Sequence, residues 1–184
     1  MKTPLIYQIS EYECGTVALL NAFNYLFSRE EIPAKIIKTI YTHSLDLGIG
    51  GTSKKAMQIL SEELNNYAES HNFKMVINYY RAQDVTLAKI LEEMNHQAVI
   101  VLRTKFNEEH YVLITNVDED NVYVFDSYYL DKSHFNNDGI KLIMDKPYSY
   151  NRKIKISHFD QELKKDYTLG KLSNREIIII RKLS

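Results

Sequence analysis

A single cysteine, Cys14, stands in the sequence Glu13-Cys14-Gly15-Thr16, where extended chain gives way to a helical pattern. The N–H groups in the first turn of a helix have no acceptor within the helix and carry partial positive charge. Both effects favour thiolate over thiol, so the pKa of a cysteine at that position falls. Gly15 lets a substrate approach the backbone closely. Cys14 is therefore a candidate nucleophile, and a buried, inert core cysteine is the alternative interpretation.

Gln8 precedes Cys14 by six residues, on a segment that we expect to be extended. Attack by a thiolate on a carbonyl group places negative charge on the carbonyl oxygen. The Gln8 side-chain amide and the Cys14 backbone N–H are two donors that could stabilise this oxyanion. A surface glutamine without such a role is the alternative.

His110 begins a predicted strand, and Asp126 follows sixteen residues later, where the next predicted strand ends. The polar turn Asp118-Glu119-Asp120-Asn121 joins these strands, so a hairpin would bring His110 and Asp126 together. The carboxylate could then fix the tautomer of an imidazole that acts as a general base. The alternative is a solvent-facing histidine and an aspartate that only starts a turn.

The remaining histidines lack a carboxylate at hairpin spacing, and we expect them on the surface or in loops: His43, His71, His96, His134 and His158. One cysteine with scattered histidines does not indicate a zinc site. The sequence has no G-x-S-x-G elbow, P-loop or G-x-G-x-x-G motif, so we expect no metal and no other cofactor. Gly48-Ile49-Gly50-Gly51 is expected to form a hinge or a cleft wall.

The 184 residues are 45% hydrophobic and 26% charged, which is typical of one globular domain or a single two-lobed one. The formal net charge of −1 does not indicate a nucleic-acid partner. A lone cysteine permits no internal disulfide, and the N-terminus has no signal-peptide pattern. No segment reaches the roughly 18 apolar residues of a membrane span. We therefore expect a cytoplasmic protein without an intrinsic membrane segment.

Helical patterns dominate the first half of the chain. Helices are predicted over 14–27, after Pro33, from a cap at Thr52 or Ser53 to Ser70, and from a cap at Asp84 to Asn95, with one strand over 73–80. Strands are predicted over 98–102, 110–117 and 122–125 and through much of 140–182, with Glu176–Arg181 as a central strand and loops over 46–51, 104–109 and 127–139. This order indicates an α+β fold with a helical part over about 1–95 and a β-rich part over about 96–184 of a single domain, 1–184.

Gln8, the pair Cys14-Gly15, the segment His110-Tyr111-Val112 and the strand that ends Phe125-Asp126 resemble the C39-like peptidases, a branch of the papain-like superfamily. The resemblance covers residues 8 to 126, and Ser127 stands where the family usually has proline. It implies a papain-like cysteine proteinase fold, with an N-terminal helical lobe followed by an antiparallel β-sheet lobe. It also implies the roles of the four residues: Cys14 as nucleophile, His110 as base, Asp126 as its orienting group and Gln8 in the oxyanion hole.

The best-known members of this family cleave leader peptides after a double glycine and are fused to an ABC transporter. We find no membrane segment or nucleotide-binding motif, so such a role implies a separate transporter or carrier partner. We predict a cysteine peptidase, with two alternatives left open: an acyltransferase or amidase with the same triad, and a non-catalytic peptide-binding module on the same fold. The expected substrate of the two enzymes is a peptide or a small amide.

Overall fold

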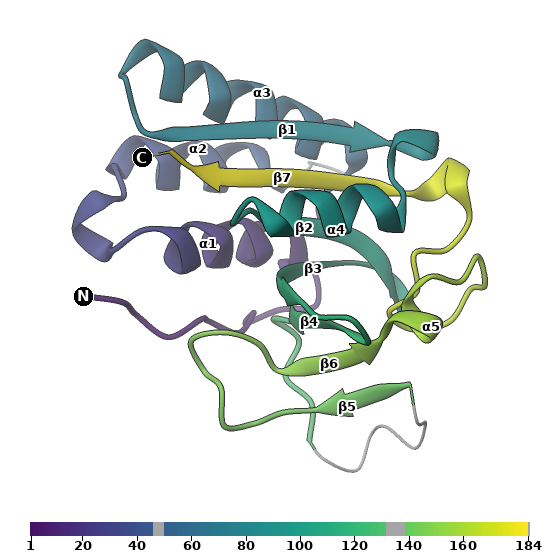
Figure 1. Ribbon diagram of the computed structural model, residues 1–184. Helices are drawn as coiled ribbons and strands as arrows, with labels where there is room; N and C mark the ends of the chain where they lie inside the picture. The colour runs from purple at the N-terminus through teal and green to yellow at the C-terminus, as the bar shows by residue number, and fades with distance from the viewer. Residues whose placement is uncertain (46–49, 132–138, 184) are drawn as a thin grey trace.

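A computed structural model describes residues 1–45, 50–131 and 139–183. These residues form a seven-stranded antiparallel sheet with helices on both faces (Figure 1). The helices are α1 (Cys14–Leu26), α2 (Ala34–His43), α3 (Lys54–Ser70), α4 (Leu87–Asn95) and α5 (Ile156–Phe159), with 3₁₀ turns at Arg29–Glu31, Ala82–Asp84 and Leu172–Asn174. The strands are β1 (Met75–Arg81), β2 (Val99–Phe106), β3 (Glu108–Val117), β4 (Asn121–Phe125), β5 (Ile140–Leu142), β6 (Arg152–Lys155) and β7 (Glu176–Lys182).

The C-terminal strand β7 lies inside the sheet, whose strand order is β1-β7-β2-β3-β4-β6-β5. Its side chains alternate between two hydrophobic clusters. Ile178 and Ile180 pack with α1, α2 and α3 on one face, whereas Ile177 and Ile179 pack with α4 and α5 on the other. A continuous apolar run is what a strand buried on both faces requires. The prediction of a central strand here is confirmed.

The α+β class is confirmed, but the helical part of the chain also contributes to the sheet. β1 lies between α3 and α4 in sequence and pairs with β7 along seven residues, from Met75 opposite Lys182 to Arg81 opposite Glu176. The helical part and the C-terminal strand of the chain therefore share one hydrogen-bonded ladder. Within the described ranges, no helix is both long and apolar enough to cross a lipid bilayer.

Most predicted elements are present, with shifted boundaries. α1 begins at Cys14, and Ser53 caps α3 by accepting a hydrogen bond from the Ala56 N–H at 3.0 Å. The cap of α4 was assigned to the wrong residue: Thr86 accepts from the Lys89 N–H at 3.1 Å. Asp84 instead ends the 3₁₀ turn that precedes α4, so its side chain is too early in the chain to cap the helix.

Two loop and strand predictions were wrong. The predicted loop over 104–109 is the tip of a tight hairpin, because β2 continues to Phe106 and β3 begins at Glu108, with Asn107 at φ +58 between them. Much of 140–182 is irregular: β5 and β6 are short, and β7 is the next strand. Residues 46–49 of one predicted loop, and 132–138 of another with His134, lie outside the described residues.

Candidate active site

Cys14 occupies the first helical position of α1, with its side chain 7% exposed. The segment before it is held by Glu13, whose Oε2 accepts hydrogen bonds from the Ile9 and Ser10 N–H groups, both at 3.0 Å. This contact fixes the turn over residues 9–12 that leads into the helix, so the chain is not extended there as we expected. The predicted position of the thiol at a helix N-terminus is therefore present.

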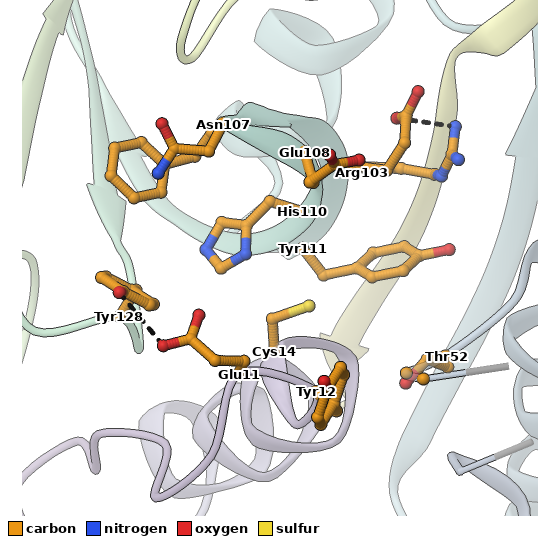
Figure 2. A pocket seen from close by; sticks show the side chains of 14 residues that line it. Glu11, Tyr12, Cys14, Thr52, Arg103, Asn107, Glu108, His110, Tyr111 and Tyr128 are labelled. Atoms are coloured by element: carbon orange, nitrogen blue, oxygen red, sulfur yellow. Dashed lines mark hydrogen bonds and ion pairs between the residues drawn. The ribbon is translucent and has the colours of Figure 1, made fainter.

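His110 and Asp126 lie together, as the hairpin spacing predicted. His110 Nε2 is 2.7 Å from Asp126 Oδ1, and their exposed fractions are 6% and 0%. Cys14 and His110 line the same pocket, and the interaction with His110 lowers the pKa of the thiol. Because Nε2 is directed at Asp126, Nδ1 is the nitrogen left for Cys14. Figure 2 shows the imidazole facing Cys14 across the pocket.

The electrostatic interactions among Cys14, His110 and Asp126 oppose the effect of burial on the pKa values of Cys14 and His110. Burial raises the pKa of the Cys14 thiol, but the hydrogen bond and charge of His110 and a backbone hydrogen bond with Tyr111 bring it below its ordinary value. Burial lowers the pKa of His110, but the charge and hydrogen bond of Asp126 raise it to about 10. Both shifts favour a thiolate–imidazolium ion pair over the neutral thiol and imidazole.

Asp126 is surrounded by donors that keep its carboxylate ionised. Oδ1 accepts from the Tyr128 N–H at 2.7 Å as well as from His110, and Oδ2 accepts from the Tyr167 hydroxyl at 2.6 Å. Burial raises the pKa of Asp126, but His110 and the charge of Arg152 hold it below its usual range. The centroid of the Phe106 ring lies 5.9 Å from that of His110 and 5.5 Å from that of Tyr167. Phe106 therefore shields the His110–Asp126 pair from water.

Gln8 lies beside Asp126, but its side chain and backbone are hydrogen-bonded to Ser10 and Ser127. Its Nε2 donates to the Ser10 carbonyl at 2.8 Å, and its Oε1 accepts from the Ser127 hydroxyl at 2.8 Å. The Gln8 N–H also donates to the Ser127 carbonyl at 3.0 Å. Gln8 is not among the described residues that line the pocket next to Cys14. Its place in an oxyanion hole stays a prediction.

A pocket of about 360 Å³ opens beside Cys14 and His110 (Figure 2). The Tyr128 hydroxyl donates to Glu11 at 3.2 Å on one side, and Arg103 pairs with Glu109 at 3.0 Å on the other. The lining residues are Glu11, Tyr12, Cys14, Gly50, Gly51, Thr52, Arg103, Phe106, Asn107, Glu108, Glu109, His110, Tyr111 and Tyr128. Gly50 and Gly51 thus form part of a cleft wall, whereas Gly48 and Ile49 lie outside the described residues.

The wall beside Cys14 is packed closely. A Cβ atom added at Gly15 would lie 2.4 Å from Thr52 Oγ1, and one at Gly50 would lie 2.7 Å from the Tyr12 ring. These glycines are therefore required by contact with their neighbours.

Of the other described histidines, His43, His71 and His96 are exposed, and the partly buried His158 has its Nε2 2.8 Å from the Asp166 carbonyl.

Sequence reasoning missed the groups that hold Asp126 from the C-terminal part of the chain. Asn151, Arg152 and Tyr167 are all buried, and each belongs to the hydrogen-bond network around the carboxylate. No motif marks them, since each is separated from Asp126 by at least 25 residues of irregular or short-strand chain. The Tyr128 contact was foreseeable, because aspartate often accepts from the backbone N–H two residues later.

Comparison with solved structures finds peptidase domains at low identity. The chain is similar to a double glycine motif protease from the AMS/PCAT transporter in complex with the leader peptide, with 12% identity over 97% of this chain and 91% of that chain and a TM-score of 0.48. It is similar to the peptidase domain of Streptococcus mutans ComA, with 12% identity, coverage of 97% and 99%, and a TM-score of 0.43.

A third solved structure is the peptidase domain of Streptococcus ComA, described as a bi-functional ABC transporter involved in a quorum sensing pathway. It shares 13% identity, with 98% of each chain covered and a TM-score of 0.49. No curated protein matches the chain in sequence. The sequence profile of the Peptidase_C39 like family matches residues 1–159, which include Cys14, His110 and Asp126, and the chain therefore belongs to this family.

Proposed function

We propose that this protein is a cysteine peptidase that hydrolyses a peptide or amide bond through an acyl-enzyme on Cys14. The observation that carries the proposal is that the buried Cys14 and His110 line one pocket, while His110 is hydrogen-bonded to the buried Asp126. Family membership points to the same chemistry. A thiolate survives best in a reducing compartment, and we place the reaction in the cytoplasm.

In the first half-reaction, the Cys14 thiolate attacks the carbonyl carbon, a C–S bond forms, and the carbonyl electron pair moves to oxygen. The Cys14 N–H and the Gln8 amide are the proposed donors to this oxyanion. The imidazolium of His110 gives its proton to the leaving nitrogen as the C–N bond breaks, which leaves a thioester on Cys14.

In the second half-reaction, His110 takes a proton from water, and the resulting hydroxide attacks the thioester carbonyl. The C–S bond breaks, the acid is released, and the thiolate–imidazolium pair is restored. Asp126 keeps its charge throughout and holds the ring in the orientation that both proton transfers need. The same first step would serve an acyltransferase, in which an amine or thiol replaces water.

The test uses an activated peptide ester and intact-mass spectrometry. The wild type is expected to gain the mass of one acyl group, and Cys14→Ala to gain none. Addition of increasing amine then separates the enzymes: a peptidase continues to release mainly free acid, whereas a transferase gives amide in proportion to the amine. A wild type that forms no acyl-enzyme over a broad panel of esters and peptides would overturn the proposal and favour a binding module.

A further inference from the structure

A buried tyrosine and a buried arginine continue the hydrogen-bond network beyond Asp126, on the side of the carboxylate away from His110. Tyr167 donates its hydroxyl proton to Asp126 Oδ2 at 2.6 Å, and the same hydroxyl oxygen accepts from Arg152 Nε at 3.3 Å. Both side chains are only 1% exposed. The hydroxyl thus bridges a guanidinium and a carboxylate, in the orientation that stabilises negative charge on Asp126.

The start of β6 also fixes the backbone at Asp126. The Asn151 side chain accepts from the Asp126 N–H at 2.8 Å and donates to the Asp126 carbonyl at 2.7 Å. Arg152 donates to the Asn151 carbonyl at 3.2 Å and to the Tyr128 carbonyl at 2.9 Å. Arg152 is therefore held at two residues, Asn151 and Tyr128, that both also bond to Asp126.

The charges in this buried group balance only when Arg152 is included. In the reactive state, the Cys14 thiolate and the Asp126 carboxylate are negative, and the His110 imidazolium is positive. The guanidinium, which stays protonated in proteins, brings the sum to zero. Without it, a buried group with a net charge of −1 would have to take up a proton, because an unbalanced charge out of water is costly. Protonation of either Cys14 or Asp126 removes the thiolate–imidazolium pair or its support.

We propose that Arg152 and Tyr167 are positioning residues for the peptidase reaction proposed above, which hold Asp126 ionised and oriented so that His110 can stabilise the Cys14 thiolate. They act through Asp126 and are not among the described residues that line the pocket. This inference rests on the proposed function, and it assigns a reason for the chain beyond β4: that part supplies the counter-charge of the site.

Other ionisable groups face the thiol and the imidazole from the neighbouring elements. Those that line the same pocket are Glu11, Tyr12, Arg103, Glu108, Glu109, Tyr111 and Tyr128. These groups are unchanged in the variants below. A difference between a variant and the wild type in the pH midpoint of thiol alkylation therefore reports on the hydrogen bonds that join Arg152, Tyr167 and Asp126.

The experiment measures the alkylation rate of the thiol by iodoacetamide against pH, which needs no substrate. Cys14 is the single cysteine of the chain, so the rate reports on this thiol alone. The wild type is expected to lose reactivity on acidification with a midpoint below the free-cysteine value of about 8.5. In Tyr167→Phe, which lacks one oxygen atom, the midpoint is expected to rise by about half a unit, and in Arg152→Gln by about one unit, as expected for loss of a nearby opposite charge. Arg152→Lys, which keeps the charge, should restore a midpoint nearer the wild type.

Two matched controls lack the link to Asp126. Arg175 is also buried and donates to the Gly170 and Val85 carbonyls at 2.9 and 3.1 Å, so Arg175→Gln tests the general effect of losing a buried guanidinium. Tyr123→Phe removes a hydroxyl that donates to the exposed Asp118. Both controls should keep the wild-type midpoint.

A folded Tyr167→Phe with the wild-type midpoint, or an equal shift in Arg175→Gln, would overturn the positioning role. If Arg152→Gln does not fold, Tyr167→Phe and Arg152→Lys decide the question. A wild type whose thiol titrates at or above about 8.5 would instead overturn the proposed function together with this inference. The two failures are therefore distinguishable in one set of measurements.

Discussion

The proposed reactivity of Cys14 requires neighbours that oppose the effect of burial on the pKa of its thiol. A thiol that is 7% exposed would ordinarily be a weak nucleophile, because desolvation disfavours its charged form. Here His110 supplies a positive charge and Asp126 stabilises that charge from the opposite side of the ring. At the residue scale, the site is therefore a set of coupled charges, and changes to one group should appear in the titration of the others.

Asp126→Asn tests this coupling. Because Asp126 raises the pKa of His110 to about 10, loss of its charge should bring the alkaline limb of kcat/KM at least one unit lower. The direction in which pH changes the unfolding free energy follows from the difference between the folded and unfolded pKa values of His110. An imidazole whose folded pKa exceeds its ordinary value of about 6.5 stabilises the folded state fully below that value, and the contribution is lost as the pH rises through about 10. The variant should lose this pH-dependent stability.

The measurements for Asp126→Asn are the pH profile of ester hydrolysis and urea unfolding at pH 6 and at pH 10. At a fixed pH on the alkaline limb, activity should fall about tenfold for each unit by which the pKa of His110 drops, whereas activity at neutral pH should fall only once that pKa approaches about 7. An unchanged alkaline limb would show that Asp126 does not support the imidazolium. Asp118→Asn, which changes a carboxylate in the exposed turn between β3 and β4, should leave the profile unchanged.

Gln8→Glu separates two roles of one side chain. The structure shows Gln8 as an anchor, with its Oε1 accepting from Ser127. Glutamate keeps this acceptor but loses the amide group, which donates to the exposed Ser10 carbonyl in the structure and which an oxyanion would require. If Gln8 stabilises the oxyanion, kcat should fall by about 10²-fold or more with little change in unfolding free energy. Ser127→Ala, which removes the anchor and keeps the amide, is the matched control and should change kcat much less.

At the scale of elements, the pocket is formed where the starts of two helices meet the tip of the β2–β3 hairpin. Cys14 begins α1, Thr52 precedes α3, and His110 lies near the start of β3. Gly15 and Thr52 touch so closely that only hydrogen fits at the Gly15 Cα. The spacing of the two helix starts, and hence the width of the pocket, depends on this contact.

Gly15→Ala should separate the two helix starts. The added Cβ would lie 2.4 Å from Thr52 Oγ1 and 2.6 Å from Thr52 Cβ, so one element must move. We expect a loss of about 1–3 kcal/mol in unfolding free energy, as for overpacking in a core, and lower ester hydrolysis. Thr52→Gly removes both atoms in the clash, so the double variant Gly15→Ala/Thr52→Gly should recover stability relative to the sum of the single changes. Strict additivity in urea unfolding would contradict the contact.

At the scale of the whole molecule, the sheet unites parts of the chain that differ in sequence character. β7 is hydrogen-bonded to β1 from the helical part on one side and to β2 from the β-rich part on the other. Its isoleucines reach the clusters on both faces. A strand in this position couples the two parts, which supports our prediction of a single domain over 1–184.

Urea unfolding should therefore show one transition. Far-UV circular dichroism follows the helices, and fluorescence of the 14 tyrosines follows packing in a chain without tryptophan. The two curves should coincide, and Ile179→Ala should move both by the same amount, with a loss of about 2–5 kcal/mol. Leu183→Ala, at an exposed position just beyond β7, should change stability by less than about 0.5 kcal/mol. Two separate transitions would indicate two domains.

The sequence by itself determined the parts of the site that depend on local pattern and short spacing. The helix start at Cys14 follows from the change of pattern around Glu13-Cys14-Gly15, and the hairpin that joins His110 to Asp126 follows from two strands around a polar turn. The four isoleucines of β7 predicted a strand buried on both faces. These features are set by backbone propensity and period, which act within about twenty residues.

Only the tertiary structure decided what surrounds Asp126 and where the Gln8 amide lies. Arg152 and Tyr167 reach the carboxylate because β6 pairs with β4 and the following irregular segment returns past Phe106. Gln8 is held by Ser127, which is 119 residues away in the chain. Contacts of this kind leave no periodic signal, because they depend on how strands are ordered in the sheet and on which buried polar group needs a partner.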